Sequence, residues 1–143
     1  MSAVRPLRSL ENVRTLHAIR VLLVGRDTRY LRAVDFLLGT RGYETRRIVR
    51  TGSLACEATR FDADVVVVDA GRGFAEAARQ AAQLAGLTPD IGVVVAVERD
   101  LPANSERLAF VDKWAPFERL VESIEHVWAE LPARDAQRGL QPH

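Results

Sequence analysis

Two residues of opposite charge each stand at the end of a short apolar stretch. Asp69 closes the stretch DVVVVD, and Lys113 follows the stretch LAFVD. Lys113 is the only lysine among the 20 lysine and arginine residues of the chain. A compact ammonium on a flexible stem can reach a carboxylate where the planar guanidinium fork of arginine does not fit. If the fold brings the two residues together, they can form an ion pair; otherwise, Asp69 serves only as a turn or helix-capping residue.

Five candidate strands are available to position these residues. Three are continuous apolar runs, which are typical of parallel strands covered on both faces, and two are weaker. The strands span residues 19–24, 45–49, 64–69, 91–97 and 108–112. Helical patterns follow them over residues 28–41, 53–60, 72–85, 102–108 and 116–130. This alternation predicts an α/β fold, an open, doubly wound parallel sheet of (βα)5 type with helices on both faces.

The expected strand order identifies the edge of the sheet to inspect. Five strands favour the flavodoxin-like order 2-1-3-4-5, in which the functional crevice lies beyond the carboxyl ends of the strands. The residues that end the strands there are Gly25, Arg26, Asp27, Asp69, Ala96 and Lys113. We expect one domain over residues 19–130, a flexible N-terminal segment over residues 1–18 and a flexible tail over residues 131–143.

Composition excludes several classes of protein. The 143 residues carry a formal net charge of +1, with acidic and basic residues interleaved, so a nucleic-acid-binding surface is not expected. A single cysteine, Cys56, excludes an internal disulfide and fits a reducing compartment. No apolar run is long enough for a signal peptide or a membrane span, so we expect a cytoplasmic protein. No phosphate loop, nucleophile elbow or zinc-protease helix is present, which argues against an enzyme.

The strand pattern and the two charged residues together resemble the receiver domain of two-component response regulators, the CheY-like family. The sequence DVVVVDA places Asp69 where the family has the aspartate that accepts a phosphoryl group from a histidine kinase. The sequence FVDKW places Lys113 where the family has a lysine that contacts the phosphoryl oxygens. The stretch RGYETRRI resembles the family's turn from the first helix into the second strand. The resemblance covers residues 19–130.

The chain departs from the receiver pattern at the metal site. Receivers end their first strand with paired acidic residues that bind magnesium together with the acceptor aspartate. Gly25 and Arg26 stand at these positions, and Asp27, one place later, suits a helix cap. Magnesium requires several oxygen ligands in octahedral geometry, so we expect it to bind weakly or not at all, and we expect no other cofactor. Arg26 is either a solvated loop residue or a cation that replaces the metal.

Two further departures affect the residues that move on activation in receivers. Ala96 replaces the hydroxyl-bearing residue at the end of the fourth strand, and Phe110 occupies the position of the switch aromatic in the fifth. The resemblance and the departures together predict an atypical, degenerate receiver-like domain. We expect it to act in signal transduction through protein contacts that are largely independent of magnesium-dependent phosphorylation.

Three alternatives remain open from the sequence. One is a flavodoxin-like enzyme unrelated to receivers, which would require catalytic residues that the sequence does not show. The chain is a phosphorylation-competent receiver if Asp69 accepts a phosphoryl group from a histidine kinase. It is a small-ligand sensor if the strand-end crevice binds a ligand on which Trp114 could stack. In the preferred reading, the partner is a protein, either a histidine kinase or an output or regulatory protein.

The last predicted helix offers a candidate contact surface. Its buried stripe is expected to contain Phe117, Leu120, Ile124 and Val127. Val121 and Trp128 lie two turns apart and could share a partly exposed strip, which makes them candidates for a homodimer interface. The alternative is that Trp128 folds over the end of the fifth strand.

Two further expectations concern the surroundings of Asp69. A neighbouring cation lowers the pKa of a carboxyl group, so the pKa of Asp69 is expected to lie below its ordinary value. Changing both Gly25 and Arg26 to aspartate is expected to recreate a metal site beside it.

Overall fold

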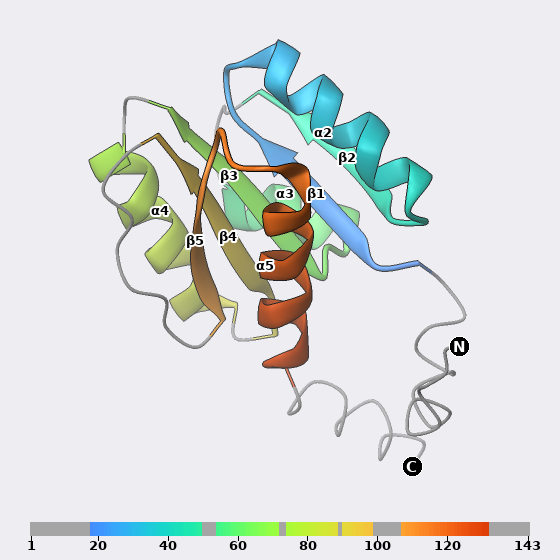
Figure 1. Ribbon diagram of the computed structural model, residues 1–143. Coiled ribbons are helices and arrows are strands. Elements are labelled where there is room, and N and C mark those ends of the chain that lie inside the picture. The colour runs from blue at the N-terminus through green and yellow to red at the C-terminus, as the bar shows by residue number, and fades with distance from the viewer. Residues whose placement is uncertain (1–17, 50–53, 72–73, 89, 99–106, 132–143) are drawn as a thin grey trace.

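The computed structural model describes residues 18–49, 54–71, 74–88, 90–98 and 107–131. Its centre is a five-stranded sheet in which all neighbouring strands are parallel (Figure 1). The strands are β1 (Arg20–Val24), β2 (Glu44–Ile48), β3 (Val65–Gly71), β4 (Gly92–Val97) and β5 (Leu108–Asp112). Their order, β2-β1-β3-β4-β5, confirms the flavodoxin-like order expected from the sequence.

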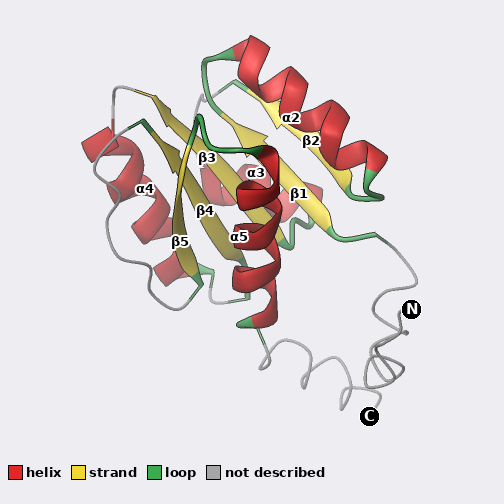
Figure 2. Cartoon of the chain, viewed as in Figure 1, coloured by secondary structure: helices red, strands yellow, loops and turns green. Residues whose placement is uncertain are grey.

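The apolar runs form the central strands because helices cover both faces of the sheet. The helices are α2 (Thr28–Thr40), α3 (Leu54–Phe61), α4 (Phe74–Leu87) and α5 (Phe117–Ala129). Helices α2 and α5 cover one face of the sheet, and α3 and α4 cover the other (Figure 2). The buried side chains accordingly form two clusters, one on each face. In β3, side chains alternate between the two cores, so all four residues from Val65 to Val68 are buried.

Helix α5 approaches the sheet closely at Gly92, the first residue of β4. A Cβ atom at this position would lie 2.8 Å from a methyl group of Val127 and 2.9 Å from its Cβ atom. Real Cβ atoms do not come this close to other carbon atoms, so only glycine allows α5 to lie at this distance from β4. This contact fixes α5, and with it the loop that carries Lys113, against the centre of the sheet.

The predicted elements agree with the observed ones to within one or two residues, apart from the connection between β4 and β5. The helix expected over residues 102–108 falls outside the described residues except at its end, where Arg107 precedes the strand and Leu108 begins β5. Residues 1–17 and 132–143, which contain most of the two expected flexible segments, also lie outside the described part. None of the helices that the structure describes is both long and apolar enough to cross a membrane.

Candidate functional site

The charged residues predicted at the carboxyl edge of the sheet meet around one nitrogen atom. The Nζ atom of Lys113 donates hydrogen bonds to Oδ2 of Asp27, at 2.9 Å, and to Oδ2 of Asp69, at 3.1 Å. We call these three residues the strand-end network. The predicted pairing of Asp69 with Lys113 is therefore present, and the sequence reasoning missed the second carboxylate, which belongs to Asp27.

Each residue of the network is held by the backbone around it. Asp27 follows β1 and caps α2, because its Oδ1 atom accepts the backbone N–H of Tyr30 at 3.1 Å. Asp69 lies near the end of β3, and its Oδ1 atom accepts the backbone N–H of Gly71 at 3.1 Å. Gly71 has a positive φ of 52°, where the register between β3 and β4 shifts. Glycine favours this turn, which directs the Asp69 carboxylate toward the lysine.

Lys113 is enclosed on its remaining sides by a third carboxylate and two aromatic rings. Oε2 of Glu98, just after β4, lies 3.9 Å from Nζ. The ring centroids of Tyr30 and Trp114 lie 4.9 Å and 5.0 Å from Nζ, within the range of a cation–π interaction. The two rings also contact each other edge to face at 6.1 Å. Sequence reasoning missed Glu98 and Tyr30, although Glu98 directly follows a predicted strand.

Burial sets the electrostatics of the network. The side chains of Lys113 and Asp69 are 3% and 2% exposed, whereas that of Asp27 is 36% exposed. Burial raises the pKa of Asp69 above its ordinary value, and the hydrogen bond and charge of Lys113 only partly oppose this effect. The expectation of a lowered pKa for Asp69 was therefore wrong, because the sequence does not reveal how completely the carboxylate is desolvated.

The other two ionisable groups of the network shift toward their charged forms. The hydrogen bond from Lys113 lowers the pKa of Asp27, and the bond from the Tyr30 backbone adds to this effect. Burial alone would lower the pKa of Lys113, but the hydrogen bonds and charges of Asp27 and Asp69 outweigh it and raise that pKa. The network therefore contains an ammonium that stays charged over the physiological pH range and is paired with both Asp27 and Asp69.

Gly25 and Arg26, at the positions of the receiver metal ligands, carry no carboxylate: Gly25 leaves room for Asp69, and the Arg26 side chain is exposed to solvent. A Cβ atom at Gly25 would lie 2.8 Å from the Cβ atom of Asp69, so the glycine allows β1 and β3 to approach each other here. An acidic side chain at this position, as in the expected metal-site variant, would collide with Asp69 unless the backbone shifted. The Arg26 side chain is exposed and has no ion pair among the described residues. Lys113 is the cation that pairs with Asp69, and Arg26 lines the cavity beside this pair, so both interpretations of Arg26 stay predictions.

The two positions that correspond to the receiver switch lie in different surroundings. Ala96 is completely buried and pairs in register with Asp69. Phe110 in β5 is partly buried and packs against the core on the α3 and α4 side of the sheet. Neither side chain places a hydroxyl group near the Asp69 carboxylate.

A cavity of about 450 Å³ opens beside the strand-end network. Charged groups line it, including Arg26, Glu76 and Glu98 besides the three residues of the network. Trp114 does not line this cavity, so the stacking expected of it in a ligand sensor would have to occur elsewhere. No group of three or more His, Cys, Asp or Glu residues in the described part of the chain is arranged to hold a metal ion.

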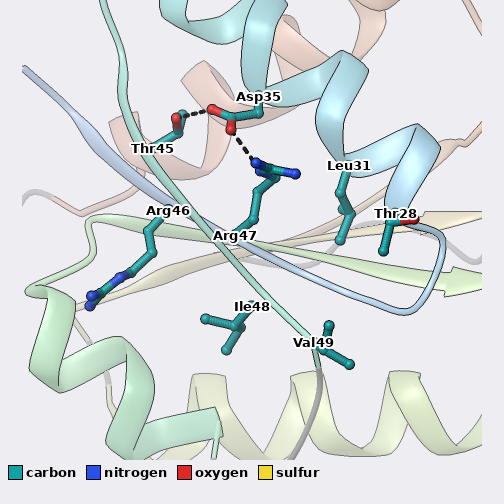
Figure 3. Close-up of a pocket in the computed structure, with 8 residues that line it drawn as sticks. All are labelled: Thr28, Leu31, Asp35, Thr45, Arg46, Arg47, Ile48 and Val49. Atoms are coloured by element: carbon teal, nitrogen blue, oxygen red, sulfur yellow. Dashed lines mark hydrogen bonds and ion pairs between the residues drawn. The ribbon is translucent and has the colours of Figure 1, made fainter.

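A second cavity, of about 310 Å³, lies between α2 and the edge strand β2. Figure 3 shows Asp35 of α2 pointing toward this strand, where it accepts a hydrogen bond from Thr45 and pairs with Arg47. The Arg47 Nε atom lies 2.8 Å from the carboxylate. These contacts pair Asp35 across the cavity, whereas Arg46, which also lines it, lies over the ring of Phe61.

The two residues proposed for an interface on α5 are not both at the surface. Val121 is buried in the same core as Leu120, Ile124 and Val127, which corrects the expectation that it lies on an exposed strip. Trp128 is partly buried and packs against this core. Since the two residues do not form a continuous exposed strip, this part of the interface prediction was wrong.

Comparison with solved structures gives close matches to the fold. The N-terminal domain of a response regulator/sensory box/GGDEF three-domain protein from Carboxydothermus hydrogenoformans aligns with a TM-score of 0.61. The two are 20% identical, over 80% of this chain and 98% of that chain. The chain has the fold of a response-regulator receiver domain. At this identity, the similarity establishes the fold and leaves the activity open.

Two further matches support the receiver fold. The CheY-like receiver domain protein from Methanospirillum hungatei has a TM-score of 0.60 and 18% identity, over 82% of this chain and 98% of that chain. A response regulator from Burkholderia pseudomallei, solved with a phosphorylated aspartic acid, calcium ion and citrate, has a TM-score of 0.62 and 18% identity. That alignment covers 83% of this chain and 74% of the other. No protein-family model matches the chain, and no curated protein matches it.

Proposed function

We propose that this chain is an atypical receiver-like signalling domain, which acts through protein contacts and does not depend on magnesium-dependent phosphorylation. The observation that carries the proposal is the position of the Lys113 ammonium, which contacts both Asp27 and Asp69. In this proposal, the lysine supplies the positive charge that a bound metal ion supplies in a phosphorylated receiver. The domain is then not an enzyme, and it works in the cytoplasm with a histidine kinase or an output protein as partner.

The electrostatics support this assignment. A magnesium ion needs about six oxygen ligands at about 2.0–2.1 Å and retains several of them as water. To bind next to Asp69, it would have to displace an ammonium that already makes two charged hydrogen bonds in a buried position. The ion would also remain close to the positive charge of Lys113, so the site opposes the cation it would need.

The alternative of a phosphorylation-competent receiver has less support. A phosphoryl group on Asp69 would add negative charge to a carboxylate that is already poorly solvated. Among the residues that the structure describes, the cations that line this cavity are Lys113, which is shared with Asp27, and the exposed Arg26. Ala96 provides no hydroxyl group to accept or donate a hydrogen bond there. The structure of the Burkholderia pseudomallei response regulator contains a calcium ion in addition to its phosphorylated aspartic acid.

Two measurements on the purified chain test the proposal. We expect isothermal titration calorimetry with magnesium chloride to show no saturable site at millimolar concentration. We also expect incubation with magnesium and acetyl phosphate to leave the mass of the protein unchanged. A saturable site, or a phosphoryl group mapped to Asp69 by mass spectrometry and lost in Asp69→Asn, would refute the proposal.

A matched variant shows whether Lys113 is the residue that prevents magnesium from binding. In Lys113→Met, the carboxylates of Asp27, Asp69 and Glu98 lose the ammonium that they share. We therefore expect magnesium chloride to raise the Tm of this variant more than that of the wild type. An equal response of the two proteins would mean that Lys113 does not exclude the metal.

A further inference from the structure

Strand β2 lies at the edge of the described sheet, where β1 pairs with one of its sides (Figure 1). The backbone N–H of Glu44 and the carbonyl of Ile48 make hydrogen bonds on the β1 side. Because the backbone groups of a strand point alternately to its two sides, those of Thr45 and Arg47 are directed toward the open edge. An open edge of this kind is a template for pairing with a strand of another chain.

The side chains of β2 carry charges on both faces of the sheet. Arg47 points toward α2, where it pairs with Asp35, and Figure 3 shows Arg46 pointing away from α2. Glu44 lies on the same face as Arg46, because the two are separated by two residues along the strand. Both are exposed. Arg46 forms no ion pair among the described residues and lies over the ring of Phe61.

These charges distinguish between the ways in which two copies of β2 can pair. A twofold axis perpendicular to the sheet makes the two strands antiparallel and passes through one residue that faces itself. With the axis at Thr45, Glu44 of each copy lies directly opposite Arg46 of the other. An axis at Glu44, Arg46 or Arg47 would place like charges directly opposite each other, which is destabilising. An axis at Ile48 would leave most of the strand unpaired.

We propose that β2 pairs with β2 of a second copy of this chain, antiparallel and with the twofold axis at Thr45, so that the two sheets join edge to edge. The two Thr45 residues face the open edge and exchange both of their backbone hydrogen bonds. Two ion pairs between Glu44 and Arg46 flank them on the face away from α2. None of these residues belongs to the strand-end network, so this inference goes beyond the proposed function and does not rest on it. It places self-association on β2, where the sequence had indicated α5.

Charge complementarity identifies a second copy as the occupant of this edge. Charged side chains on an edge strand commonly prevent pairing with other strands. On β2 they oppose pairing about an axis at Glu44, Arg46 or Arg47 and favour pairing about Thr45. A strand of a different protein would need a carboxylate opposite Arg46 and a cation opposite Glu44. The second copy supplies both at the correct spacing because of the symmetry.

Exchange of the two charges tests the pairing. We expect sedimentation equilibrium of the wild type to show a monomer–dimer equilibrium at concentrations up to millimolar. Glu44→Arg alone and Arg46→Glu alone each place like charges opposite each other, so each should raise the dissociation constant of the dimer by about tenfold or more. The double variant restores opposite charges and should dimerise within about threefold of the wild type.

Mixing the two single variants provides a second readout. One copy then carries two arginines at these positions and the other carries two glutamates, so we expect a heterodimer where each variant alone is monomeric. Both side chains are exposed, and exposed ion pairs contribute little to folding, so circular dichroism should show that all the variants remain folded.

Other exposed charges provide matched controls. Arg60→Glu on α3 and Glu122→Arg on α5 change the net charge as the two test variants do. We expect both to leave the dissociation constant within about twofold of the wild type, since long-range charge effects are screened by salt.

Three results would overturn this proposal. The first is a wild-type protein that remains monomeric throughout the concentration range. The second is a dimer that Glu122→Arg dissociates or that both single variants on β2 leave intact, which would assign the interface to another face. The third is a loss of dimer in the single variants that neither the double variant nor the mixture restores, because Glu44 and Arg46 would then not face each other. The magnesium and acetyl phosphate measurements do not involve β2, so they can refute the proposed function while the dimer persists.

Discussion

Replacing Lys113 by methionine is the most direct perturbation of the strand-end network. The change removes the positive charge and keeps most of the length of the side chain. The Asp69 carboxylate then loses the ammonium at 3.1 Å and, within the described part of the chain, retains the backbone N–H of Gly71 as its donor. Asp27 is less affected, because it is partly exposed and continues to cap α2.

The size of the effect follows from the burial of Asp69. Removing one partner of a buried ion pair costs about 3–5 kcal/mol, because it leaves an uncompensated buried charge. The pKa of Asp69 is already raised, so the carboxyl group can take up a proton and limit this cost. We therefore expect a loss of about 3 kcal/mol at neutral pH, from the lower end of that range. For a domain of this size, such a loss corresponds to a fall in Tm of roughly 10–15 °C.

Urea unfolding at neutral pH measures the free energy of unfolding of four proteins: the wild type, Lys113→Met, Asp69→Asn and the double variant. We expect Asp69→Asn alone to have a small effect, since Lys113 keeps Asp27 as its partner. We expect the double variant to recover at least half of the loss caused by Lys113→Met, because no charge is then stranded. A coupling energy below about 0.5 kcal/mol between the two changes would show that the side chains do not interact as described.

The pH dependence of the stability of Lys113→Met provides an independent check on the direction of the Asp69 pKa shift. A carboxyl group whose pKa is raised in the folded state binds more protons there than in the unfolded chain. Its contribution to stability is therefore fully present below the unfolded pKa and is lost as the pH rises through the folded pKa. We expect the deficit of Lys113→Met relative to the wild type to shrink as the pH falls below neutral. A deficit that is constant or grows with falling pH would contradict the role assigned to Asp69.

Three further predictions concern the surroundings of the network. Gly92→Ala should lower the free energy of unfolding by about 1–3 kcal/mol in urea unfolding, because its methyl group overlaps α5, whereas Gly86→Ala, in open space, should not lower it. Asp27→Asn keeps the helix cap, so it should lower the free energy of unfolding by at most about 1 kcal/mol. This difference from the wild type should be present above pH 3.8, the ordinary pKa of Asp27, and should be lost as the pH falls through the lowered pKa. Gly25→Asp should destabilise the domain in thermal unfolding, because its Cβ atom would meet Asp69; a Tm equal to that of the wild type would mean that β1 and β3 can separate there.

The arrangement of the sheet could be predicted because burial on both faces leaves a strong pattern. The continuous valine run before Asp69 and the run before Glu98 are buried strands, as expected. The meeting of Asp69 and Lys113 followed from the same pattern, since parallel strands end at one edge. The hydrogen bond between Asp27 and Lys113 was not predicted, because the sequence position of Asp27 indicated only a helix cap. The cap uses Oδ1, and Oδ2 accepts the hydrogen bond from Lys113.

Two errors have a common physical cause, which is that sequence spacing does not give depth of burial. Val121 follows Leu120 directly, and helical spacing suggested that only one of them faces the core. Both are buried, in the core cluster that α5 shares with α2 and the sheet. Similarly, the charges around Asp69 were correctly identified, but the pKa depends on its desolvation, which only the folded structure shows.

The strand-end network also has a consequence for the order of events in folding. Lys113 is separated along the sequence by 44 residues from Asp69 and by 86 residues from Asp27. Closing loops of this length costs entropy that these hydrogen bonds alone cannot offset, so β3 and β4 must be in place first. A contact that forms after the main barrier slows unfolding and leaves the folding rate nearly unchanged. The single lysine of the chain would then determine chiefly how long the folded domain persists once it has formed.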